Sequence, residues 1–90
     1  MIALRQTPTF KRAYKKFRDN ERKEINTAIR CISNQPESGE LKTGDLAGVR
    51  VYKFHMHDQQ ILLAYEYNGE TVILLMAVGV HESFYRDLKR

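Results

Sequence analysis

The sequence predicts an α+β domain in which an N-terminal helical hairpin packs on one face of a small, mainly antiparallel β-sheet. In the first half, apolar side chains recur at helical spacing in two stretches joined by a short connection. In the second half, three strand-like runs follow one another, and Asn68-Gly69 between the last two is a strong hairpin signal. A single domain is expected to span residues 1–90, because the chain has no room for a second folded unit.

The first helix is expected to begin at Thr7-Pro8, after a short strand over residues 2–6. Threonine is a favoured N-cap, and proline suits the first helical position because its missing N–H needs no partner there. The apolar stripe of this helix comprises Phe10, Ala13, Tyr14 and Phe17. Its remaining faces carry Lys11, Arg12, Lys15, Lys16 and Arg18. These basic side chains are interpreted either as a solvated face or as a surface that steers RNA by long-range attraction.

The second helix is expected to follow a turn and cap at Asp19-Asn20, with Glu21 and Glu24 near its positive N-terminal end. Its apolar stripe comprises Ile25, Ala28, Ile29 and Ile32. It should end at Gln35-Pro36, because proline disfavours helical geometry in the preceding residue. The single cysteine, Cys31, lies within this apolar pattern, so we expect a buried thiol rather than a nucleophile.

The residues that follow are expected to form a loop and then the sheet. Residues 36–48 are rich in Gly, Glu, Ser and Asp and predict a loop with one turn of order around Leu41. A tight connection at Asp58-Gln59 separates the first two predicted strands. The three strands of the antiparallel meander are expected over residues 49–56, 60–67 and 71–80.

Strand alternation divides residues 49–57 between two faces. Arg50, Tyr52, Phe54 and Met56 share one face, which suits the side covered by the helices. Val49, Val51, Lys53, His55 and His57 share the other, open face. A cation beside two imidazoles on an open sheet face can grip phosphate and exchange protons. A solvated polar face is the plainer interpretation of the same pattern.

The spacing of His55 and His57 is also that of a metal-binding pair on a strand. Further ligands would then come from His81, Glu82 or Asp58. Three histidines without a tight pattern are a weak signal, so no metal and no cofactor are expected. The sequence also lacks a Gly-rich phosphate loop, a GxSxG motif and zinc-finger spacing. These absences exclude most enzyme classes but not small ribonucleases.

The last ten residues follow a strand-like run and combine an imidazole, a phenol and several cations. Histidine moves protons near neutral pH, tyrosine stacks on bases, and arginine and lysine hold phosphate. The residues concerned are His81, Tyr85, Arg86, Lys89 and Arg90. Phe84 is expected to anchor the segment, so that His81, Tyr85 and Arg86 face one opening. The alternative is a helical tail that His81 merely caps.

Composition points to an anionic partner. The chain carries 15 Lys and Arg against 11 Asp and Glu, a formal net charge of +4, with a pI near 9.4. This balance suits nucleic acid or an acidic protein, although a merely basic protein fits equally well. No secretory signal is recognisable, and the apolar run over residues 71–80 is too short to span a bilayer. A cytoplasmic protein without membrane partners is therefore expected.

The order of these segments resembles the RelE/ParE superfamily of toxins from bacterial type II toxin–antitoxin pairs. The segments that carry the resemblance are Leu46-Ala-Gly-Val-Arg50, Val51-Tyr-Lys-Phe-His55, Ile61-Leu-Leu-Ala-Tyr65 and Gly79-Val-His-Glu-Ser-Phe-Tyr85. The resemblance covers nearly the whole chain and implies a RelE-like fold of the microbial ribonuclease type. The pattern of glycine, histidine and a following aromatic in the last of these segments is most similar to that of the histidine-using mRNA interferases of the superfamily, such as YafQ.

What the resemblance implies is a small cytoplasmic toxin. The RelE branch enters the ribosomal A site and cuts mRNA, with the 2′-hydroxyl attacking the adjacent phosphate. The ParE branch inhibits DNA gyrase without acting as an enzyme. Each is silenced by a co-encoded antitoxin, so a hetero-oligomer with an acidic, amphipathic antitoxin segment is expected, together with the ribosome and its mRNA.

The resemblance also implies roles for particular residues. Lys53 and His55 match two basic groups on one strand of RelE-like toxins, His81 matches a residue acting on the phosphate, and Tyr85 matches a terminal aromatic. The candidate catalytic residues are therefore His81, His55, Lys53 and Tyr85. The candidate substrate-binding residues are Arg50, Arg86, His57 and Lys89. Leu62 departs from the family, because many members have arginine there. Compensation by other cations, a slower nuclease, a gyrase inhibitor and an inactive relic all remain open.

Overall fold

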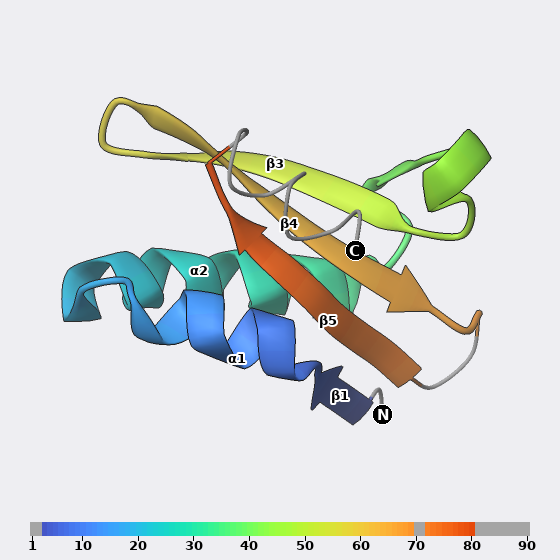
Figure 1. The fold of residues 1–90 in the computed structure, drawn as a ribbon, viewed down its shortest axis with the longest axis horizontal. Coiled ribbons are helices and arrows are strands. Elements are labelled where there is room, and N and C mark those ends of the chain that lie inside the picture. Colours follow the sequence, from blue (N-terminus) through green and yellow to red (C-terminus); the bar gives the residue numbers. More distant parts are fainter. Residues whose placement is uncertain (1–2, 70–71, 81–90) are drawn as a thin grey trace.

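The computed structural model describes residues 3–69 and 72–80. Two helices cover one face of a five-stranded sheet, which confirms the predicted α+β architecture (Figure 1). The helices are α1 (Pro8–Lys15) and α2 (Asp19–Asn34), and a short 3₁₀ helix, η1, spans Gly44–Leu46. The strands are β1 (Ala3–Gln6), β2 (Glu40–Leu41), β3 (Arg50–Met56), β4 (Gln59–Tyr67) and β5 (Val72–Gly79).

The sheet order is β1-β5-β4-β3-β2, with β4 in the centre. The predicted meander β3-β4-β5 is confirmed as antiparallel, and β1 adds to it in parallel beside β5. The prediction that residues 36–48 form a loop was incomplete, because β2 and η1 lie within them. A two-residue strand is too short to leave an alternating pattern in the sequence. Its place at the sheet edge is set by tertiary pairing of Leu41 with Arg50.

The connection between β3 and β4 lies one position earlier than predicted. His57 and Asp58 form the two-residue loop, and β4 begins at Gln59. The predicted connection at Asp58-Gln59 was therefore wrong by one residue. The turn depends on a positive φ of 56° at His57. The chemistry of a histidine side chain does not predict this backbone angle.

The start of α1 agrees with the prediction at Thr7-Pro8. The Thr7 hydroxyl accepts a hydrogen bond from the Phe10 N–H at 3.1 Å, as an N-cap does. The same hydroxyl donates to the Met76 carbonyl at 2.9 Å, and the Thr7 N–H donates to the Leu75 carbonyl. One threonine therefore caps α1 and ties it to β5.

The start of α2 differs from the prediction by one position. Arg18 is the N-cap, so Asp19-Asn20 is the first part of the helix and not a turn before it. The Glu21 carboxylate accepts from the Arg18 N–H at 2.8 Å, which replaces the missing side-chain cap. The Arg22 guanidinium pairs with Asp19 and donates to the Phe17 carbonyl, so it fastens the end of α1 to the start of α2.

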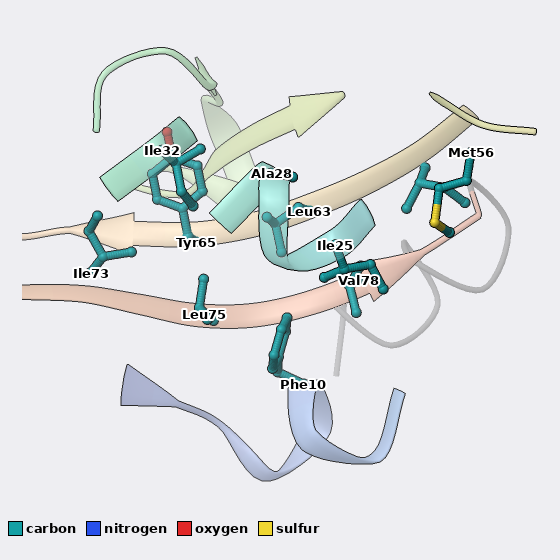
Figure 2. Close-up of a cluster of buried hydrophobic side chains, with 11 residues drawn as sticks. Phe10, Ile25, Ala28, Ile32, Met56, Leu63, Tyr65, Ile73, Leu75 and Val78 are labelled. Atoms are coloured by element: carbon teal, nitrogen blue, oxygen red, sulfur yellow. The ribbon is translucent and has the colours of Figure 1, made fainter. Parts of the chain in front are cut away.

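The main core lies between the helices and the sheet. Figure 2 shows side chains of α1 and α2 meeting those of β4 and β5. The buried members are Phe10, Ile25, Ala28, Ile32, Met56, Ile61, Leu63, Tyr65, Ile73, Leu75 and Val78. Tyr52 and Phe54 pack against this cluster, so the helix-covered face predicted for them is confirmed.

A second, smaller cluster lies on the opposite face of the sheet. It comprises Val49, Val51, Leu62, Ala64 and Ala77, with Leu46 and Met76 packed against it. The central strand β4 is consequently buried on both sides, and residues 61–65 are each at most 1% exposed. This face is therefore not uniformly open, as the alternation had suggested. Lys53, His55 and Gln60 are exposed at its end near the β3–β4 loop.

The Cys31 thiol is exposed, so the expectation of a buried thiol was wrong. The buried face of α2 is formed by Ile25, Ala28 and Ile32, and Cys31 lies just outside that face. Burial raises the pKa of Tyr52, and a hydrogen bond with Cys31 adds to the rise. Cys31 therefore borders the core without belonging to it.

The Tyr65 hydroxyl holds the loop after α2 against the sheet. It donates to the Pro36 carbonyl at 2.6 Å and accepts from the buried Gly39 N–H at 2.9 Å. A Cβ atom on Gly39 would lie 2.7 Å from the Tyr65 oxygen, so glycine is required at this close approach. The Arg50 guanidinium donates to the Gly39 carbonyl at 2.9 Å and so secures the same loop from β3.

Replacing Tyr65 by Phe should lower the free energy of unfolding by about 1–3 kcal/mol, because two backbone groups would lose their partner in a buried site. Urea denaturation measures the change. Tyr14→Phe is the matched control, since the Tyr14 hydroxyl donates to Asn26 Oδ1 in an exposed position. That control should cost roughly 0.5 kcal/mol. Equal losses in the two variants would contradict the role assigned to Tyr65.

Candidate functional site

Lys53 and His55 lie side by side on the face of β3 that the helices do not cover. Both side chains are exposed, and alternation places them on the same face about 7 Å apart along the strand. In the register with β4, Lys53 is opposite Leu62 and His55 is opposite Gln60. An ammonium and an imidazole therefore stand together where a phosphate can reach both.

His57 occupies the first position of the loop that follows this strand. Its φ of 56° is in the left-handed region, which costs a non-glycine residue about 1 kcal/mol. A positive φ at the first loop position is what a type II′ hairpin turn demands, and glycine normally supplies it. The side chain is exposed and extends the polar end of the sheet beyond His55.

A buried apolar position adjoins these polar groups. Leu62 is opposite Lys53 on one side and opposite Gly79 on the other, so the three residues form one row across β3, β4 and β5. Leu62 is 1% exposed and packs within the second cluster, so this position has a structural role.

Arg50 is separated from Lys53 and His55 by the thickness of the sheet. It pairs with the buried Tyr65 and lies on the helix-covered face. Its guanidinium donates to the carbonyls of Glu37 and Gly39 at 3.3 and 2.9 Å. These contacts give Arg50 a structural role, while the substrate-binding role expected for it stays a prediction.

The remaining candidate residues lie outside the described part of the chain. They are His81, Tyr85, Arg86 and Lys89. Their expected roles stay predictions. The described strand β5 ends at Gly79, in the same row as Leu62 and Lys53.

Gln60 is a residue of this face that the sequence analysis did not single out. It is exposed and directly opposite His55, so its amide can donate to or accept from a group bound there. The antiparallel register would have identified it, but the register depends on which residues form the loop. A one-residue error in the loop moves the partner of every residue in β3.

Neither a metal cluster nor a membrane helix is found among the described residues. Within residues 3–69 and 72–80, no group of three or more His, Cys, Asp and Glu side chains could hold a metal ion. Neither α1 nor α2 is long and apolar enough to cross a bilayer.

Comparisons with known proteins are consistent with this architecture. A family model described as ParE-like toxin of type II bacterial toxin–antitoxin system matches residues 4–89. A chain in the crystal structure of the intact E. coli RelBE toxin–antitoxin complex matches with a TM-score of 0.71 and 16% sequence identity. The match covers 91% of this chain and 99% of that chain. No curated protein matches the chain in sequence.

Replacing His57 by Gly should stabilise the protein by about 0.5–1 kcal/mol, because glycine adopts a positive φ without steric cost. Thermal or urea denaturation measures the gain. Asp58→Gly is the control: the second loop position does not have a positive φ, so this change should not stabilise. A loss of stability in His57→Gly would instead mean that the imidazole makes a contact worth more than the strain.

Proposed function

The chain belongs to the ParE-like toxins of type II bacterial toxin–antitoxin systems, and we propose that it cuts mRNA in the ribosomal A site. The observation that supports this proposal is the exposed pair formed by Lys53 and His55 on the free face of β3. Translation would be inhibited by loss of the message. The ribosome with its mRNA is then the partner in the reaction.

The reaction is a transfer within the RNA strand. The 2′-hydroxyl loses its proton and attacks the adjacent phosphorus, forming a 2′,3′-cyclic phosphate. The bond to the 5′-oxygen of the next nucleotide breaks, and that oxygen takes up a proton. The nucleophile is held next to its target by the ribose itself, so no metal is required to supply it.

In this proposal, His81 and His55 exchange the two protons, one as base and the other as acid. Lys53 stabilises the charge that develops on the phosphate, the larger share of such catalysis. Tyr85 positions the scissile nucleotide. His57, Arg86 and Lys89 hold the flanking phosphates, and Arg50 keeps β3 and the loop before it in place through its bonds to Glu37 and Gly39.

Inhibition of DNA gyrase without catalysis is the second candidate function. The family model is described as ParE-like, and the ParE branch of the superfamily acts on gyrase. Leu62 favours the same alternative: it is a buried packing residue at the position where many RelE-like toxins have a cation. In that case the face around Lys53 and His55 would contact a protein.

The deciding experiment adds the purified protein to a programmed ribosome and maps mRNA ends by primer extension. Wild type should produce cuts in the ribosome-bound message at the A-site codon. His55→Ala, Lys53→Gln and His81→Ala should each slow cleavage by roughly 10²-fold or more, since each removes a proton-transfer or charge-stabilising group. Lys23→Gln is the control, because Lys23 is an exposed cation on α2, which covers the face of the sheet opposite to Lys53 and His55.

The same preparation is tested for inhibition of supercoiling by purified gyrase. Intact mRNA together with inhibited supercoiling would replace the nuclease proposal by the gyrase inhibitor. Cleavage that persists at the wild-type rate in His81→Ala and Tyr85→Ala would overturn the residue assignments while leaving the activity in place.

We also propose where the antitoxin binds. A groove of about 470 Å³ lies between β1, α1 and α2, and it is lined by Leu4, Gln6, Phe10, Tyr14, Asn26, Ile29, Arg30, Ser33 and Leu75. Leu4 is 46% exposed, an unusual position for a large apolar side chain on an edge strand. An amphipathic antitoxin segment would cover it, and Arg30 in the lining favours an acidic sequence.

Leu4→Ser should weaken antitoxin binding by about tenfold, the equivalent of roughly 1.4 kcal/mol, with little change in stability. Isothermal titration calorimetry with the co-encoded antitoxin measures it. Leu41→Ser is the matched control, because Leu41 is 53% exposed at the opposite edge of the sheet. If only the Leu41 variant loses affinity, the antitoxin occupies the β2 edge and this assignment is wrong.

A further inference from the structure

The positive charge of this protein is concentrated in one short segment of the helix layer. Residues 8–18 contain five basic side chains and no acidic one, namely Lys11, Arg12, Lys15, Lys16 and Arg18. The other residues carry ten basic and eleven acidic side chains, so the whole net charge of +4 originates in this segment. All five side chains are exposed, and we call them the α1 basic surface.

Among the described residues, no ion pair offsets this charge. In the part of the chain that the structure describes, the ion pairs are Arg22 with Asp19 and Lys42 with Glu40, and neither involves the α1 basic surface. Lys11 and Lys15 are four residues apart on α1, a spacing at which like charges repel. The helix dipole favours cations in the last turn, which holds Arg12 and Lys15, whereas Lys11 lies before that turn. The mutual repulsion of these side chains would be relieved beside an anion.

The chemistry of the α1 basic surface suits phosphates better than a protein. A protein interface needs an apolar centre and is poor in lysine. The exposed large apolar side chains of the described residues are Leu4 and Leu41, and neither lies on α1. The apolar side chain of Phe10 is turned into the core instead. A surface of cations without an apolar anchor suits a nucleic-acid backbone, because binding to phosphates needs positive charge and no recognition of the bases.

We propose that the α1 basic surface binds the phosphate backbone of helical RNA, independently of sequence. Helix α1 lies in the helix layer on one face of the sheet (Figure 1). Lys53 and His55 lie on the other face, because they alternate along β3 with Tyr52 and Phe54, which pack against the helix-side core. The protein would then contact RNA on two sides, with folded RNA held at α1 and a single strand processed at β3. The choice of RNA over DNA rests on the proposed function; the phosphate-binding surface itself does not.

The test measures binding of the full chain to a 20-base-pair RNA duplex with 2′-O-methyl riboses, which cannot be cut by attack of a 2′-hydroxyl. Fluorescence anisotropy is recorded between 50 and 200 mM salt. Lys11→Gln with Lys15→Gln should weaken binding about tenfold, and the slope of log K against log salt should become less steep by about two. Lys23→Gln with Lys42→Gln removes the same charge elsewhere and should leave affinity within twofold.

Each other outcome overturns the inference. Equal losses in the two double variants would show attraction by net charge alone, and no loss in either would place binding elsewhere. A DNA duplex of the same sequence bound more tightly through Lys11 and Lys15 would exclude RNA as the ligand. Loss of antitoxin affinity with unchanged RNA binding would make the surface a protein interface. Binding of the 2′-O-methyl duplex requires no cleavage, so an absence of mRNA cleavage in the ribosome experiment would leave this result standing.

Discussion

The burial of β4 on both faces is the constraint on which the rest of this structure depends. Residues 61–65 are each at most 1% exposed, which requires the helices on one side and the second apolar cluster on the other. A slip of one residue would exchange the two sets of side chains, so the register of β4 with β3 and β5 is strongly fixed. Tyr65 then extends the influence of β4 to the loop after α2 through two hydrogen bonds.

The candidate site lies where this burial ends. Gln59 and Gln60 at the start of β4 are exposed, and burial begins at Ile61. Lys53 and His55 therefore project from a strand whose position is fixed by the core, while their side chains remain in water. Such a placement gives a site precise geometry without burying its charges, which would be costly. The positive φ of His57 adds local strain at the same end of the sheet.

The structure assigns its polar and apolar features to different surfaces. The free face of the sheet carries Lys53 and His55, the α1 basic surface carries the net charge, and the groove beside Leu4 is apolar. The groove and the α1 basic surface both involve α1, because Phe10 and Tyr14 line the groove. Lys53 and His55 lie on the other face of the sheet from both.

The sequence by itself determined the helical hairpin, the antiparallel meander and the division of β3 into two faces, because side-chain periodicity of 3.6 and 2 reports which face is buried. Thr7-Pro8 also placed the start of α1, since capping is a local interaction. The tertiary structure decided the pairing of β1 and β2, the loop at His57, the exposed position of Cys31 and the second cluster around Leu62. It also set the register that places Gln60 opposite His55. The pairing of β1 with β5 and the second cluster depend on contacts between residues distant in the chain, and the loop at His57 depends on a backbone angle, so a local pattern of side chains does not encode them.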